Sequence, residues 1–512
     1  MAITQKNDIV PEILFVAGNA AHAKRVLRLA SEGALRKVYS GIYTSNLASP
    51  LDAVVLRNWQ AIVGYLLPGG VVSFRSAVAA RPEEGKLYIT RGKTRRTITL
   101  PGLSVKVVPG SGPLTQGPAP DAPFKALYLA SEARWLLENL VAAKGVAERV
   151  LPRGELEAQL DKRLVLRGES GLNRLRETCR EVSIALGLQK EFARLDKIIG
   201  ALLGTRGQRQ LRSRQALARA AGKPYDPRRL ELFDTLFSHL QANVMPQVRD
   251  RAPTGAAPDN FAFYESYFSN YIEGTTFLVS EAEEIIFEGK IMPNRNADAH
   301  DVLGTFQAAS QAPWRNAPAN SEDDFLTWLK SVNALVMQAR PDKNPGEWKD
   351  KVNQAGNTLF VDPTLVPGTL REGFARVLAL QDPFARALMI MFVISEVHPF
   401  QDGNGRTARL AMNAELTAKG LSRIIIPTVY REDYLLPLKA LSNNREPAPY
   451  LAAMSKIQEW TAAFDYGQPR SVITEALKAC NAFEEDLRRF RLIFPEVPAS
   501  YRVPVSRLGL PS

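Results

Sequence analysis

The alternation of apolar and polar residues divides the chain into a mixed first part and a helical remainder. Residues 8–35 interleave apolar and cationic positions with helical spacing, which predicts short helices. A β-rich stretch follows at residues 37–44, around a Ser-Gly turn. Residues 86–90 and 94–100 then alternate with a period of two across Gly92, which predicts a hairpin.

Proline and glycine are concentrated in residues 109–123, which predicts a linker. From about residue 125 to residue 222 the apolar spacing is helical. From residue 229 to about residue 490 nearly every segment is again helical, apart from a loop and extended region around residues 340–367. The predicted fold class is therefore mainly α, with a small α+β module at the N-terminal end.

The composition of the chain argues against several classes of protein. The 512 residues include only two cysteines, Cys179 and Cys480, so neither a disulfide framework nor a cysteine-based zinc site is expected. The four histidines lie far apart, which argues against a transition-metal enzyme. The longest apolar run, residues 387–394, is much too short to span a bilayer, and no signal peptide is recognisable. We expect a soluble, reduced, cytoplasmic protein that does not contact membranes.

The net charge of +12 is unevenly distributed. Residues 1–250 contain 38 Lys and Arg against 22 Asp and Glu, whereas the remainder contains 27 against 31. Such an asymmetry is typical of a basic module with a polyanionic partner, although a basic face also serves solubility. A run of arginines between Arg206 and Arg229 is open to the same two interpretations.

The segment with the clearest chemistry is His398-Pro-Phe-Gln-Asp-Gly-Asn-Gly-Arg-Thr-Ala-Arg409. A helix ending at Val397 is expected to stop at His398, because Pro399 disfavours helical geometry in the residue before it. Phe400 is expected to anchor the loop in the core. Gly403 and Gly405 allow a tight turn, and a new helix is expected from Asn404.

A glycine-rich turn that opens a helix presents free N–H groups and the positive end of the helix dipole, which together bind anions. Arg406 and Arg409 lie on neighbouring positions beside that turn. Asp402 offers a hard carboxylate suited to a phosphate-bound Mg²⁺. His398 is a base that is largely neutral at physiological pH. The combination predicts phosphoryl or nucleotidyl transfer onto a hydroxyl.

This segment resembles the signature of Fic-domain proteins, HPFx(D/E)GN(G/K)RxxR, at all nine fixed positions. The resemblance implies an all-helical domain that transfers AMP from ATP to a Ser, Thr or Tyr hydroxyl of a target protein. By position, His398 would deprotonate the hydroxyl and Asp402 would hold Mg²⁺. The nucleotide would be bound by Gly403, Asn404, Gly405, Arg406 and Arg409, with Arg409 reaching the γ-phosphate. Doc-like relatives that phosphorylate carry Lys where this chain has Gly405, so AMP transfer is favoured.

Two further segments resemble parts of the family's site. Residues 346–356 are similar to the flap that pairs with the target backbone, with these docking residues: Val352, Asn353, Gln354, Ala355 and Gly356. Tyr434 and Asn443 fall near the positions of adenine-pocket residues in the family. Their spacing departs from it by about two residues, so a packing role is an equal alternative.

Ser269-Asn-Tyr-Ile-Glu-Gly274 resembles the family's inhibitory motif, (S/T)xxxE(G/N). Ser269 and Glu273 are four residues apart and share a helix face. The resemblance implies that Glu273 pairs with Arg409 and so displaces the γ-phosphate. The alternative is an ordinary exposed helical Glu.

Residues 20–80 resemble the winged-helix start of AbiEi-type antitoxins, from a first helix through a Gly-Ile-Tyr wing to the segment Val-Val-Ser-Phe-Arg-Ser-Ala. The family more often has His or Arg where this chain has Phe74. Phosphate contacts to duplex DNA are expected from Lys24, Arg25, Arg28, Arg36 and Lys37. A winged helix that binds protein is the alternative.

The sequence thus predicts a winged-helix-like module at 1–125, a basic helical segment at 126–228, a Fic domain with its inhibitory helix at 229–490 and a tail at 491–512. The predicted function is an autoinhibited protein adenylyltransferase that uses Mg-ATP. The alternative is a DNA-binding regulator or antitoxin-like protein with a regulatory or de-AMPylating Fic domain. The sequence does not indicate the target protein, the DNA site or the oligomeric state.

Overall fold

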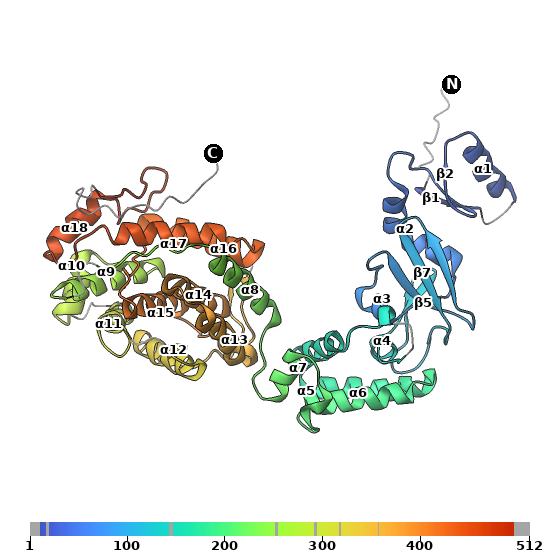
Figure 1. Cartoon of the computed structure of the whole chain (residues 1–512), viewed down its shortest axis with the longest axis horizontal. Helices are drawn as coiled ribbons and strands as arrows, with labels where there is room; N and C mark the ends of the chain where they lie inside the picture. The colour runs from blue at the N-terminus through green and yellow to red at the C-terminus, as the bar shows by residue number, and fades with distance from the viewer. Residues whose placement is uncertain are drawn as a thin grey trace. The chain divides into compact units, whose positions relative to one another are not determined.

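A computed structural model describes residues 11–16, 20–142, 147–250, 254–290, 294–316, 319–356 and 358–495 (Figure 1). The chain divides into two compact units, residues 1–221 and 222–512. The finer division at residues 125 and 228 remains a prediction, and most of the predicted tail lies outside the described residues. None of the described helices combines the length and the apolar character required to cross a bilayer.

The first unit begins with a small antiparallel sheet of order β1-β3-β2. Its strands are β1 (Ile13–Phe15), β2 (Arg36–Tyr39) and β3 (Ile42–Thr44), and helix α1 (Ala20–Ser31) lies between β1 and β2 in the chain. The prediction of helices alone over residues 8–35 is therefore wrong at β1; residues 8–10 are outside the described part. Ile13 and Phe15 pair with β3, about 30 residues later, a partner that local spacing does not reveal.

A six-stranded sheet of order β6-β7-β5-β4-β9-β8 forms the rest of the β structure. Its strands are β4 (Val71–Val72), β5 (Lys86–Thr90), β6 (Arg96–Leu100), β7 (Leu103–Val108), β8 (Ala122–Phe124) and β9 (Leu127–Leu129). The predicted hairpin between β5 and β6 is wrong, because in the sheet β7 lies between these two strands and pairs with both. β6 pairs antiparallel with β7 across Gly102, whose φ of 66° suits the turn, and β5 pairs parallel with β7.

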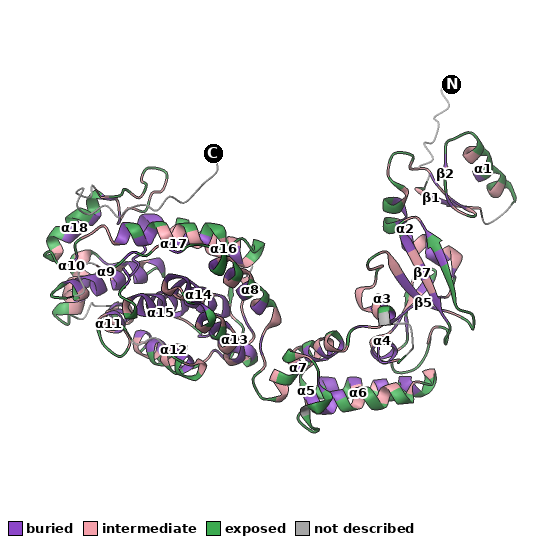
Figure 2. Ribbon diagram, in the orientation of Figure 1, coloured by how far each residue is buried: buried purple, intermediate pink, exposed green. Residues whose placement is uncertain are grey.

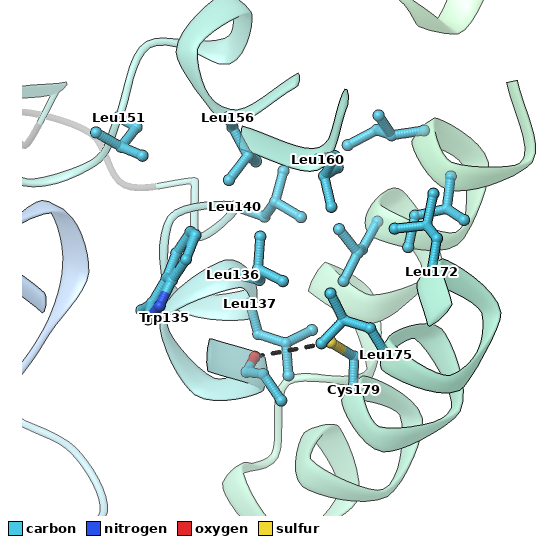
Figure 3. Packing of buried hydrophobic residues seen from close by; sticks show 14 of the residues in the cluster. Trp135, Leu136, Leu137, Leu140, Leu151, Leu156, Leu160, Leu172, Leu175 and Cys179 are labelled. Carbon is cyan, nitrogen blue, oxygen red and sulfur yellow. Dashed lines mark hydrogen bonds between the residues drawn. The ribbon is translucent and has the colours of Figure 1, made fainter. Parts of the chain in front are cut away.

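The remaining helices of this unit are α2 (Leu51–Leu66), α3 (Phe74–Ala79), α4 (Glu132–Glu138), α5 (Arg153–Leu186), α6 (Gln189–Leu202) and α7 (Arg214–Ala220). The apolar faces of α3 to α7 meet in a core that includes Leu136, Leu160 and Cys179 (Figure 3), whereas α2 packs in a second core with residues of the sheet. The segment predicted as a linker is packed instead. Arg134 donates to the carbonyls of Ser111 and Gly112 and pairs with a buried Asp121 at 2.7 Å.

The second unit is helical, as predicted. Its helices are α8 (Pro227–Ala242), α9 (Ala257–Ile272), α10 (Val279–Phe287), α11 (Asn296–Ser310), α12 (Glu322–Val336), α13 (Val366–Ala379), α14 (Pro383–Val397), α15 (Asn404–Ala418), α16 (Arg431–Asn444), α17 (Ala448–Thr461) and α18 (Arg470–Ala479). α14 is apolar on almost every side and, with α15, is buried among the others (Figure 2). A helix that is apolar all round is stable only in such a position.

Among the described residues of the second unit, the strands lie in the predicted loop and extended region, and an isolated bridge joins Arg249 and Leu421. The strands β10 (Gln354–Ala355) and β11 (Thr358–Leu359) form a two-stranded antiparallel ladder. α8, α9 and α13 pack around α14 and α15. Asn353, just before β10, donates to the Phe400 carbonyl, so the ladder lies beside the turn between α14 and α15.

Candidate active site

The turn between α14 and α15 has the predicted shape. α14 ends at Val397, and His398 adopts a left-handed conformation with φ of 52° before Pro399. Gly403 has φ of 77°, and α15 begins at Asn404. Phe400 is 1% exposed and stacks on Trp348 with ring centroids 5.1 Å apart. The prediction that Phe400 anchors the loop is confirmed.

The side chain of Asn404 differs from its expected phosphate-binding role. Its Nδ2 donates to the carbonyl of Phe400 at 2.9 Å, and its Oδ1 accepts from the Phe400 N–H at 2.8 Å. Both ends of the amide are therefore used to close the loop. The Asn404 side chain holds the shape of the turn in this structure, and its assistance in phosphate binding stays a prediction.

The structural reason for glycine at position 405 also differs from the prediction. Its φ is not in the left-handed region, so no tight turn requires glycine here. A Cβ at this position would lie 2.2 Å from Oε1 of Glu273 and 3.1 Å from Nη1 of Arg409. The absence of a side chain at Gly405 makes room for the Glu273 carboxylate over the first turn of α15. Anionic groups are favoured there by the unpaired N–H groups and the helix dipole.

The carboxylate in that space is held by Arg409. Oε1 of Glu273 accepts from Nη2 of Arg409 at 2.7 Å, and Glu273 is the C-terminal cap of α9. Nε of Arg409 donates to Oγ of Ser269 at 2.9 Å, and Nη2 donates to the Ser269 carbonyl at 2.9 Å. Gly274 has φ of 92° and turns the chain away. The predicted pairing of Glu273 with Arg409 is present in the structure.

The electrostatics of this pair favour charge on both partners. Burial alone would raise the pKa of Glu273, but the charge and hydrogen bond of Arg409 outweigh it, so the pKa is lowered. Burial opposes charge on Arg409 as well, yet Glu273 and Tyr434 raise its pKa. Tyr434 is buried and bonds to Arg409, whereas Asn443 is exposed near the end of α16. Of the two predicted adenine-pocket residues, only Tyr434 contacts this cluster.

The guanidinium of Arg406 is held by side chains of α9 and α11. Its Nη1 pairs with Oδ2 of Asp301 at 2.6 Å and donates to Oδ1 of Asn270 at 3.2 Å. Arg406 and Asp301 are both nearly inaccessible to solvent. An ion pair this buried ties α15 to α11, so the guanidinium is committed to the fold. The role of Arg406 in nucleotide binding stays a prediction.

Asp402 lies at the solvent-exposed rim of the turn. Its Oδ1 accepts from the Gly403 N–H at 2.6 Å, and its side chain is 42% exposed. No cluster of three or more His, Cys, Asp or Glu side chains that could hold a metal ion occurs among the described residues. A single accessible carboxylate beside an anion-binding turn fits Mg²⁺, which is commonly bound through one or two carboxylates together with substrate phosphates.

The imidazole of His398 lies between a backbone carbonyl and an aromatic ring. Its Nδ1 is 3.4 Å from the carbonyl of Ser395, which favours a proton on Nδ1 and leaves Nε2 as the acceptor. The ring stacks on Phe360 at 3.9 Å with an interplanar angle of 10°. Burial lowers the pKa of His398 to about 4, and the charge of Lys349 contributes in the same direction. His398 is therefore a neutral base.

This pKa gives a testable expectation. In the nucleotide-free protein, the His398 ring should titrate near pH 4 rather than near its ordinary value of about 6.5. The unfolded chain then binds more protons than the folded chain between these values. The contribution of His398 to stability should thus fall as pH is lowered through this window. NMR of labelled histidine rings, assigned with His398→Ala, measures the midpoint, and a value near 6.5 would contradict the burial argument.

The predicted flap forms the β10–β11 ladder and is joined to the turn by side chains. Nδ2 of Asn353 donates to the Phe400 carbonyl at 2.9 Å, and Nζ of Lys349 donates to Oδ1 of Asn353 at 2.7 Å. Val352 and Leu359 are exposed. Of the remaining predicted docking residues, Gln354 and Ala355 form β10, and Gly356 follows it.

Sequence reasoning missed three side chains at this site. Asp301 lies about 100 residues before its partner Arg406, and no local pattern connects them. Phe360, which stacks on His398, follows the flap in the chain and belongs to no motif that the sequence analysis identified. Asn333 donates to the Asp402 carbonyl at 3.0 Å and accepts from the Gly346 N–H at 2.9 Å, so it holds the turn and the flap together.

The predicted DNA contacts lie in the first unit. Lys24, Arg25 and Arg28 are exposed on α1, and Lys37 is exposed on β2. Arg36 is half-buried and donates to the Ser49 carbonyl at 2.5 Å, so its guanidinium is engaged within the unit.

The chain is similar to several known proteins. A Fic-domain signaling protein from Bacteroides thetaiotaomicron aligns with a TM-score of 0.36 at 18% identity, covering 46% of this chain and 93% of that one. The chain is 27% identical over 201 residues to the protein adenylyltransferase Fic of Culex quinquefasciatus, covering 38% of this chain and 40% of that protein. It is 27% identical over 225 residues to the protein of the same name from Nematostella vectensis, covering 41% and 51%.

The aligned part of the chain spans about half or less of the length of these relatives. The model of the Fic/DOC family matches residues 324–416, which include the flap, His398 and Arg409. Residues 324–416 of this chain therefore form a Fic domain.

Proposed function

We propose that the second unit is a protein adenylyltransferase that transfers AMP from ATP to a hydroxyl of a target protein. One observation carries the proposal: Arg409 and the N-terminus of α15 together hold a carboxylate over Gly405, and His398 lies near enough for the charges of His398 and Glu273 to act on each other. The curated relatives in Culex quinquefasciatus and Nematostella vectensis are named protein adenylyltransferases, which supports the same activity.

In the proposed reaction, Nε2 of His398 accepts the proton of the target hydroxyl while its oxygen forms a bond to the α-phosphorus of ATP. The bond from the α-phosphorus to the oxygen bridging it to the β-phosphorus breaks, and pyrophosphate leaves with that electron pair. The N–H groups at the start of α15 hold the phosphates, and Arg409 binds the γ-phosphate. The flap holds the target chain beside His398.

Asp402 would hold Mg²⁺, which neutralises phosphate charge when it is bound. The side chains of this protein have separate duties: Asn404 closes the turn, and Asp301 fixes Arg406 beneath it.

Regulation is part of the proposal. The Glu273 carboxylate accepts a hydrogen bond from Arg409. It lies over the first turn of α15, where phosphate oxygens would otherwise be held. Arg409 cannot serve both anions with the same Nη2 group. Nucleotide would still find the helix N-terminus, so we expect Glu273 to suppress turnover more than nucleotide binding.

The position of the transferred label tests the reaction class. With Mg²⁺ and ATP, the protein or a partner should acquire label from α-³²P-ATP and not from γ-³²P-ATP. Transfer from the γ position alone would establish kinase chemistry and defeat this proposal.

We further propose that the first unit binds duplex DNA. Residues 1–221 contain 34 Lys and Arg against 18 Asp and Glu, so this unit has a net charge of +16. Lys24, Arg25 and Arg28 are exposed together on α1. Cations grouped on one exposed helix are suited to phosphate contacts, which supply affinity without reading sequence.

Salt dependence tests the DNA proposal. The affinity of the full chain for a DNA duplex should fall as salt rises. Changing Lys24, Arg25 and Arg28 together to Ala should reduce the logarithmic slope by about one for each phosphate that these side chains neutralise. Lys162, Arg174 and Lys190, which are exposed on α5 and α6, provide a charge-matched triple control. No retention on DNA at low salt would indicate a protein-binding module.

A further inference from the structure

A buried ammonium group lies beside the catalytic turn. Lys349 is only 4% exposed, and no described carboxylate lies within ion-pairing distance of it. Burial lowers the pKa of Lys349 to about 8, with the charge of Arg229 acting in the same direction and that of Asp362 opposing it. A buried charge without a counter-ion is costly. Its contacts indicate what it does.

Those contacts join the flap to the backbone on both sides of His398. Nζ of Lys349 donates to Oδ1 of Asn353 at 2.7 Å and to the Val397 carbonyl at 3.3 Å. Its backbone N–H donates to the Pro399 carbonyl at 2.9 Å. One residue thus contacts the residue before His398, the residue after it and the first part of the flap.

The flap in turn places an aromatic ring on the imidazole. The Phe360 N–H donates to the Asn353 carbonyl at 3.1 Å, so the position of Phe360 depends on the position of Asn353. The Phe360 ring stacks on His398 at 3.9 Å, and Nζ of Lys349 lies 5.9 Å from the centroid of the Phe360 ring. Lys349, Asn353, Phe360 and His398 form one connected assembly.

We propose that Lys349 is a positioning residue for AMP transfer: its ammonium group sets the flap relative to the catalytic turn and so fixes the His398 ring, through Phe360, toward the acceptor hydroxyl. This inference rests on the proposed function. Lys349 touches no reacting atom in the proposed reaction; it acts through His398 and the flap. A misplacement of about 1 Å can cost about 10²-fold in rate, so loss of this link should be visible in turnover.

The charge of Lys349 also reaches His398. Among the groups that face the imidazole, Lys349 lowers the pKa of His398, whereas Glu273 and Asp402 act to raise it. Removing the ammonium group should therefore move the His398 titration midpoint upward. The midpoint reports whether the ammonium group lies close enough to act on the imidazole, and exchange of the Phe360 amide hydrogen reports whether it holds the flap in place.

The experiment compares Lys349→Met with Lys349→Arg in the Glu273→Gly protein. Met retains the length of the side chain without the ammonium group, and relief of the buried charge should offset the loss of its two hydrogen bonds, so the melting temperature should change little. We expect Lys349→Met to lower kcat/KM for the protein acceptor by about 10-fold to 10²-fold, to leave the KM for ATP nearly unchanged, and to raise the His398 midpoint measured by NMR. Exchange of the Phe360 amide hydrogen should accelerate. Lys349→Arg should restore the rate, the midpoint and the exchange protection.

Lys419→Met is the matched control, because Lys419 is exposed at the opposite end of α15 from the catalytic turn. It should leave all four measurements unchanged. A folded Lys349→Met protein with the parent rate, midpoint and exchange protection would overturn the proposal. If the Glu273→Gly parent transfers no AMP at all, the proposed function fails, while the midpoint and the exchange rate still decide whether Lys349 positions His398.

Discussion

Replacing Glu273 with Gly should raise AMP transfer by at least about 10-fold, which corresponds to about 1.4 kcal/mol off the barrier. The carboxylate is bonded to Nη2 of Arg409 at 2.7 Å and lies over the first turn of α15. Its removal frees both for the phosphates of ATP. Glu273 is a helix cap rather than a mid-helix residue, so the cost to α9 should not exceed about 1 kcal/mol and the fold should survive. Label from α-³²P-ATP measures the rate.

Glu288→Gly is the matched control, because Glu288 is also a helix C-cap, on α10, and is exposed. It removes the same side chain from the same kind of position and should not change the rate. A variant that combines Glu273→Gly with His398→Ala should lose at least about 10²-fold of this activity, which separates released catalysis from non-enzymatic labelling. If Glu273→Gly melts normally, binds ATP and is no more active than wild type on every acceptor tested, then Ser269–Gly274 is an ordinary helix end and autoinhibition is wrong.

Replacing His398 with Ala in the Glu273→Gly background should lower AMP transfer by about 10²-fold to 10⁴-fold, the usual contribution of a general base. His398 presents Nε2 as an acceptor because Nδ1 faces the Ser395 carbonyl, and its lowered pKa keeps the ring neutral at physiological pH. Affinity for ATP should change little, since the helix N-terminus and Arg409 remain. Single-turnover rates at saturating ATP measure the chemical step.

His239→Ala serves as the control for loss of an imidazole, because His239 lies on α8 and bonds only to neighbouring Asn243 among the described contacts. It should retain the parent rate. An unchanged rate in a folded His398→Ala protein would remove His398 from the mechanism. A loss of ATP binding equal to the loss of rate would instead assign His398 to nucleotide binding.

The turn between α14 and α15 was determined by the sequence itself. Its parts are consecutive: the helix that stops before Pro399, the left-handed Gly403, and the helix that starts at Asn404 are all decided by local backbone preferences. The helix predicted to end at Val397 is α14. The motif around Glu273 indicated its partner, Arg409, through a resemblance to a known family rather than through local physics.

Only the tertiary structure decided which distant groups meet. Asp301 reaches Arg406, Lys349 reaches Val397, and Phe360 reaches His398 through contacts that no periodicity encodes. The strand order around β7 was missed for the same reason: the hairpin predicted for β5 and β6 had the correct alternation but the wrong partner. Alternation reports which face of a strand is buried, and helical spacing reports which face of a helix is buried. Neither reports what lies against that face, because the partner is selected by packing between segments far apart in the chain.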